Sequence, residues 1–131
     1  MKEEISFAVK KLQDSVQRLT EGISQAQDEL DKDGVIQRFE FTFELLWKTL
    51  KVLLESEGID CVTPKECLKS AFRIGIIKDE QIVLDMLEDR NKTSHIYDEK
   101  ESKKVFEKIK EEYLPSIQGI LDKLKQRQRN V

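Results

Sequence analysis

Apolar side chains recur at alternating steps of three and four residues along most of the chain, which is typical of amphipathic helices. The first such stretch predicts a helix from about residue 3 to 30, roughly 40 Å long at the usual helical rise. We expect it to end at Asp31-Lys32-Asp33-Gly34, which has the composition of a turn. The residues of its apolar face are Ile5, Ala8, Val9, Leu12, Val16, Leu19, Ile23, Ala26 and Leu30.

A second helix, from about residue 35 to 57, is the most apolar part of the chain. Its core stripe is formed by Ile36, Phe39, Phe43, Leu46, Leu50 and Leu53. Its polar strip is formed by Glu40, Glu44, Lys48, Lys51 and Glu55, with Trp47 at the edge. Phe41, Leu45 and Val52 fall on a second apolar strip, roughly opposite the first. Because a helix that is apolar on two sides is usually covered twice, this strip is a candidate contact with another chain.

Capping signals mark the helices that follow. Gly58 suits a helix C-terminus, and Thr63-Pro64-Lys65-Glu66 has the N-cap, first-turn proline and glutamate of a helix start. We predict a short helix from about residue 64 to 74, closed by Gly75. A fourth helix should begin near Asp79 and fray between Arg90 and Ser94. Its inward residues are Ile82, Val83, Met86 and Leu87.

Asp98 followed by Glu101 marks the start of the last helix. We expect Pro115 to kink it or break it locally, and we expect the basic tail to fray from about residue 125. Its core face is formed by Phe106, Ile109, Tyr113, Ile117, Ile120 and Leu124. With no strand-like alternation or internal repeat, the pattern predicts one all-α domain over residues 1–131. The expected architecture is an up-and-down four-helix bundle with an additional short helix.

The composition narrows the range of functions. A net charge of −3 argues against a general nucleic-acid coat, although it leaves room for a small basic cleft. The chain has neither an apolar run long enough to cross a membrane nor the apolar segment of a signal peptide, so we expect a cytoplasmic protein. The spacing of Cys61 and Cys67 is unusual for zinc, and we expect two reduced thiols and no metal or other cofactor.

The candidate chemistry lies between residues 87 and 98, a stretch that holds the single histidine of the chain, His95. Histidine titrates near neutral pH, so a histidine close to Arg90 and Tyr97 suggests proton transfer. On a continuous helix Arg90 and His95 would point about 140° apart. They can face one ligand only if the helix ends between them, which Thr93, Ser94 and the Asp98 cap favour.

The string from Arg90 to Tyr97 reads R-x4-H-x-Y, with a polar Asn91 directly after the arginine. It resembles the signature of HEPN domains (higher eukaryotes and prokaryotes nucleotide-binding). Residues 39–51 resemble the corresponding helix of one HEPN branch, the nucleotidyltransferase substrate-binding proteins, which are partners of a minimal nucleotidyltransferase. The resemblance covers nearly the whole chain.

The resemblance implies a helical bundle that forms a homodimer, with two Arg/His pairs meeting at a two-fold cleft. It implies a metal-independent endoribonuclease toxin, in a toxin–antitoxin module, whose nucleotidyltransferase partner silences it by attaching AMP to Tyr97. Residue chemistry agrees: His95 can serve as base or acid, and Arg90 can bind the phosphate. Asn91, Lys92 and Ser94 could add phosphate contacts. Phe41, Leu45 and Val52 would contact the second copy or the partner enzyme.

Simpler interpretations remain open. His95 could be a surface or capping residue, and Arg90 could pair with Glu88 or Asp89. Glu40 and Glu44 could line a nucleotide site, but pairing with lysines along an exposed helical stripe is simpler. The acidic net charge also suits a non-catalytic module that presents a substrate or nucleotide to the nucleotidyltransferase. A purely structural dimeric bundle is a third, weaker hypothesis.

Overall fold

The computed structural model describes residues 2–93 and 98–129. Within these ranges every element of regular structure is helical. The elements are α1 (Lys2–Gln25), α2 (Glu29–Ser56), α3 (Pro64–Arg73), α4 (Glu80–Thr93), α5 (Glu99–Lys108), the π-helix η1 (Ile109–Tyr113) and α6 (Leu114–Arg129).

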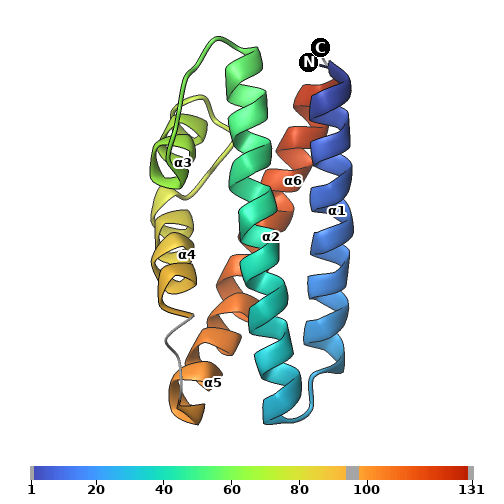
Figure 1. Cartoon of the computed structure of the whole chain (residues 1–131), viewed down its shortest axis with the longest axis vertical. Helices are drawn as coiled ribbons and strands as arrows, with labels where there is room; N and C mark the ends of the chain where they lie inside the picture. Colours follow the sequence, from blue (N-terminus) through green and yellow to red (C-terminus); the bar gives the residue numbers. More distant parts are fainter. Residues whose placement is uncertain (1, 94–97, 130–131) are drawn as a thin grey trace.

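The helices alternate in direction along a common long axis (Figure 1). α1 and α2 run antiparallel, α3 and α4 follow one another along α2, and α5, η1 and α6 return as one continuous rod. α1 and α6 are in contact, and Figure 1 shows the start of α1 and the end of α6 at the same end of the molecule. The prediction of an up-and-down four-helix bundle with an additional short helix is confirmed.

The core follows the predicted stripes. All six residues of the α2 core stripe are buried, and so are all six residues predicted for the inner face of the last helix. Phe39 of α2 stacks on Tyr113 of η1 with ring centroids 5.4 Å apart, which joins the central helix to the returning rod.

The break between the first two helices lies earlier than predicted. α1 ends at Gln25, and α2 begins after Asp28, whose side chain accepts a hydrogen bond of 2.8 Å from the backbone of Asp31. The carboxylate of Asp31 in turn accepts from the backbone of Gln27, at 3.0 Å. This reciprocal capping makes the expected turn the first turn of a helix. Leu30 is consequently 78% exposed and lies outside the core, which corrects its assignment to the apolar face of the first helix.

The other predicted caps are confirmed. Gly58 and Gly75 both have a positive φ, at +79° and +86°, and follow the ends of α2 and α3. Thr63 and Asp98 accept hydrogen bonds from the third residues of α3 and α5, at 3.2 and 2.9 Å. The α2–α3 connection is therefore capped at both ends, by Gly58 and Thr63, and Asp98 caps the start of α5.

Pro115 leaves the last rod unbroken but alters its winding. Proline lacks a backbone N–H, and the turn before it widens into η1, in which the N–H of Leu114 donates to the carbonyl of Ile109. The following helix continues to Arg129, beyond the point where we expected fraying. There Arg127 donates two hydrogen bonds of 2.7 Å to Glu57, which raises the pKa of Arg127 and lowers that of Glu57.

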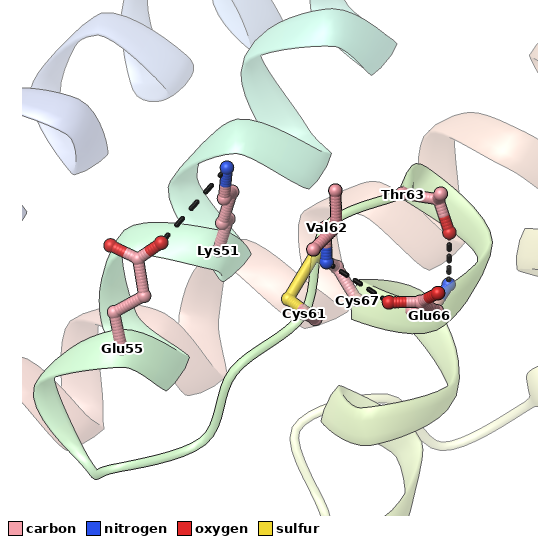
Figure 2. Close-up of a disulfide and its surroundings, with 7 residues drawn as sticks. All are labelled: Lys51, Glu55, Cys61, Val62, Thr63, Glu66 and Cys67. Atoms are coloured by element: carbon pink, nitrogen blue, oxygen red, sulfur yellow. Dashed lines mark hydrogen bonds and ion pairs between the residues drawn. A yellow bond between two sulfur atoms is a disulfide. The ribbon is translucent and has the colours of Figure 1, made fainter.

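Cys61 and Cys67 form a disulfide bond, with their Cα atoms 5.2 Å apart, so the prediction of two reduced thiols is wrong. Figure 2 shows the bond beside the cap of α3, where Glu66 accepts from the backbone of Val62 and donates its own N–H to Thr63. This capping folds the loop back over the first turn of the helix and brings the two sulfur atoms together. Within the ranges that the structure describes, no helix is long and apolar enough to cross a membrane.

Candidate functional site

Arg90 lies in the last turn of α4 and faces the central helix α2. Its Nη2 donates to Oε1 of Glu44, and its Nη1 donates to Oδ1 of Asn91 at 3.3 Å. The ion pair joins two helices across 46 positions of sequence, and both side chains are about one-third exposed, at 33% and 28%. Neither Glu88 nor Asp89, the partners considered from the sequence, is the acid in this pair.

A groove of about 470 Å³ opens above this ion pair. It is lined by Gln37, Glu40, Phe41, Glu44, Arg90 and Asn91. Two carboxylates face one guanidinium, so the described part of the groove carries a net negative charge. Phe41 belongs to the second apolar strip of α2, and it lines the same groove as Arg90. Helix periodicity alone did not predict that the two would lie together.

The histidine and the tyrosine of the motif follow α4 in sequence. α4 ends at Thr93, between Arg90 and His95 in sequence, and the next helix begins after Asp98. Ser94, His95 and Tyr97 lie outside the described residues.

Asn91 and Lys92 are both exposed but point to different partners. Asn91 lines the groove and receives a hydrogen bond from Arg90. Lys92 forms an ion pair of 3.1 Å with Glu88, one turn earlier on the same helix, and this hydrogen bond raises the pKa of the lysine. Of the two, only Asn91 shares the groove with Arg90.

Two acidic residues hold Arg90 in place through contacts that the sequence did not predict. Glu44 contacts it directly. Asp89, its neighbour, accepts a hydrogen bond from the hydroxyl of Tyr113 and lies 3.7 Å from Nζ of Lys108. Burial of the phenol, followed by the hydrogen bond to Asp89, raises the pKa of Tyr113. These contacts attach the last turn of α4 to η1.

The second apolar strip of α2 is only partly covered. Leu45 and Val52 pack against the core with part of their surface exposed, whereas Phe41 is 59% exposed.

Among residues 2–93 and 98–129 there is no group of three or more His, Cys, Asp and Glu side chains placed to hold a metal ion.

Comparisons with known proteins agree on one family. The model of the family described as nucleotidyltransferase substrate binding protein like matches residues 4–126. A protein from Haemophilus influenzae named probable ribonuclease HepT is 33% identical over 99 residues, which span 72% of this chain and 67% of the relative.

A crystal structure of a protein from Thermus thermophilus has the same fold, with a TM-score of 0.75 and 30% sequence identity. The match covers 90% of this chain and 98% of that one. The family match spans most of the helical bundle, including the last turn of α4 with Arg90 and the whole R-x4-H-x-Y string. The chain therefore belongs to the nucleotidyltransferase substrate-binding family of HEPN-domain proteins.

Proposed function

We propose that this chain is the HEPN subunit of a two-component nucleotidyltransferase/HEPN toxin–antitoxin module. In this proposal it is a metal-independent endoribonuclease whose partner silences it by attaching AMP to Tyr97. The observation that carries the proposal is the placement of Arg90. It lies in the last turn of α4, beside a groove, directly before the connection that contains His95 and Tyr97. The relative named a probable ribonuclease supports the same activity.

The proposed chemistry is an internal transfer within RNA. A base removes the proton of a ribose 2′-hydroxyl, the 2′-oxygen bonds to the adjacent phosphorus, and the bond from phosphorus to the 5′-oxygen breaks. An acid then protonates the departing 5′-oxygen. His95 would serve as base or acid, and the guanidinium of Arg90 would stabilise the charge on the phosphorane oxygens. Asn91, Lys92 and Ser94 are candidates for further phosphate contacts.

RNA cleavage in the presence of a metal chelator tests the proposal. We expect the purified chain to release fragments with a 2′,3′-cyclic phosphate and a 5′-hydroxyl. We expect His95→Ala to cleave at least about 100-fold more slowly, since a positioned acid–base group typically contributes that much. Its helical circular dichroism should match that of the wild type. Equal cleavage by both proteins would remove His95 from the mechanism.

Tyr97 is the proposed site of AMP attachment. The chain contains two tyrosines, and the other, Tyr113, is 1% exposed with its hydroxyl bonded to Asp89. An enzyme could reach the hydroxyl of Tyr113 only by unpacking the core. AMP on Tyr97, two residues from His95, would add bulk and negative charge where the RNA phosphate has to bind.

We propose that a second copy of this chain and the nucleotidyltransferase both dock on the bundle. Phe41 is the candidate anchor, with Leu45 and Val52 beside it on α2. Because a two-fold dimer repeats each patch, a contact through Phe41 would bring two Arg90 grooves near one another. RNA and an ATP-using partner would both be met in the cytoplasm, which is where we propose that the protein acts.

One observation favours a second function. The described part of the groove has two carboxylates and one guanidinium, a poor attractant for RNA phosphates. A non-catalytic subunit that presents a substrate or nucleotide to the nucleotidyltransferase would not require such attraction. That function predicts tight binding to the nucleotidyltransferase, measurable by calorimetry, together with no RNA cleavage by the isolated chain.

A further inference from the structure

The carboxylate of Glu44 is held by several groups at once. Oε1 accepts from Nη2 of Arg90. Oε2 accepts from the indole Nε1 of Trp47 at 3.2 Å and lies 3.6 Å from Nζ of Lys48. Trp47 and Lys48 lie on the same helix as Glu44, so α2 itself sets the orientation of the carboxylate. Arg90 belongs to another helix and meets a carboxylate that is already oriented.

This arrangement differs from the ordinary ion pairs on the same helix. Lys51 and Glu55 are one turn apart on α2, with 4.0 Å between Nζ and Oε1, and their pair joins no second element. Such exposed pairs contribute little to stability. The Glu44 pair instead fixes a side chain of α4 against α2 at the groove between them.

A fixed guanidinium is what phosphate recognition requires. Arginine binds a phosphate through a planar fork of N–H groups, and its long side chain loses about 2 kcal/mol of rotamer entropy when it is immobilised. The contacts to Glu44 and Asn91 restrain both Nη atoms before any RNA binds. Most of the rotamer entropy of Arg90 is then lost when the protein folds, and less of it has to be lost when RNA binds and reacts.

We propose that Glu44 is a positioning residue for Arg90: it sets the plane of the guanidinium at the groove and acts on the reaction only through that side chain. This inference rests on the proposed ribonuclease function. The opposite role is also testable, because a carboxylate that merely competes with phosphate for Arg90 would weaken RNA binding. The two roles predict effects of opposite sign when Glu44 is removed.

The experiment measures kcat and KM for RNA cleavage by the wild type, Glu44→Ala, Glu44→Gln and Glu55→Ala. For Glu44→Ala we expect kcat to fall about 10- to 100-fold with little change in KM, as for a misplaced transition-state contact. Glu44→Gln keeps an oxygen that accepts from Nη2, so it should recover a large part of the lost kcat. Glu55→Ala removes the same charge from the same helix and should cleave like the wild type.

NMR of the arginine side chains supplies a readout that does not depend on cleavage. The Nη–H signals of Arg90, assigned by their loss in Arg90→Lys, should show hindered rotation in the wild type and free rotation in Glu44→Ala. If Glu44→Ala does not fold, Glu44→Gln carries the test through a smaller loss of kcat and faster Nη rotation. Unchanged values in both measurements with that variant would overturn the inference.

The outcomes separate this inference from the proposed function. An active wild type with equal kcat in Glu44→Ala would overturn the positioning role and leave the ribonuclease standing. Tighter RNA binding or faster cleavage by Glu44→Ala would identify a competitor, and would also overturn it. A wild type that does not cleave RNA would overturn the proposed function, and an NMR contrast would then show only an architectural ion pair.

Discussion

The hydroxyl of Tyr113 donates a hydrogen bond to the carboxylate of Asp89, which joins the π-helix η1 to the last turn of α4. Asp89 directly precedes Arg90, so this bond restrains the backbone from which the motif arginine projects. Pro115 contributes indirectly to this restraint, because the π-helix η1 that precedes it includes Tyr113. Pro115, two positions after Tyr113, thus helps to define the candidate site.

Removal of that hydroxyl should destabilise the protein. Tyr113→Phe keeps the aromatic ring and its stacking on Phe39. It removes the hydroxyl that donates to the largely buried carboxylate of Asp89, which keeps Lys108 as its other partner. We expect the free energy of unfolding in urea to fall by about 1–2 kcal/mol, a usual net contribution of one hydrogen bond to a carboxylate. A Tyr113→Phe protein as stable as the wild type would show that the bond contributes nothing.

The same residue predicts a pH dependence. Burial and the neighbouring Asp89 raise the pKa of Tyr113, so the folded protein retains the phenolic proton after the unfolded chain has lost it at about pH 10. The stabilisation is therefore complete below about pH 10 and is lost as the pH rises further. Unfolding in urea between about pH 9 and pH 11 should show a steeper loss for the wild type than for Tyr113→Phe. Parallel curves would contradict the shift.

The helices and the core were predictable from the sequence because both depend on local periodicity and on caps. Thr63, Asp98 and the two capping glycines are local signals, and the structure has all four. The first turn was misplaced because Asp28 and Asp31 can belong to a loop or to a capped helix start. Their reciprocal hydrogen bonds, rather than their composition, decide between the two.

The site was less predictable, because its contacts join residues far apart in the sequence. Arg90 was identifiable from the motif, but its pairing with Glu44 depends on how α2 and α4 cross. Helix periodicity places Glu44 on the polar strip of α2 and gives no information about the second helix. The Cys61–Cys67 disulfide was missed for a related reason, since it forms through the fold of a loop.

Exposed Phe41 should govern self-association. Phe41→Asp places a charge at the proposed contact, so we expect sedimentation to show monomers at concentrations at which the wild type is dimeric. Phe7→Asp is the matched control, because Phe7 is 67% exposed and lies on α1. Loss of association in both variants, or in neither, would contradict a specific contact through Phe41.

The disulfide should stabilise the bundle modestly. Cys61 and Cys67 are 6 positions apart, and closure of so short a loop is worth about 2 kcal/mol in the chain-entropy model. Reducing agent should lower the urea midpoint of the wild type and leave that of a Cys61→Ala/Cys67→Ala variant unchanged. An equal midpoint for the wild type with and without reductant would show that the bond does not stabilise the fold.

The most direct test of the toxin proposal measures RNA cleavage by the same protein sample before and after AMP is attached to it. The purified chain is assayed for RNA cleavage in chelator, incubated with its nucleotidyltransferase and ATP, and assayed again while mass spectrometry locates any AMP. We expect cleavage before the incubation, AMP on the peptide that contains Tyr97, and cleavage lost in proportion to modification. A chain that is inactive before modification, or equally active with AMP on Tyr97, would contradict the central claim.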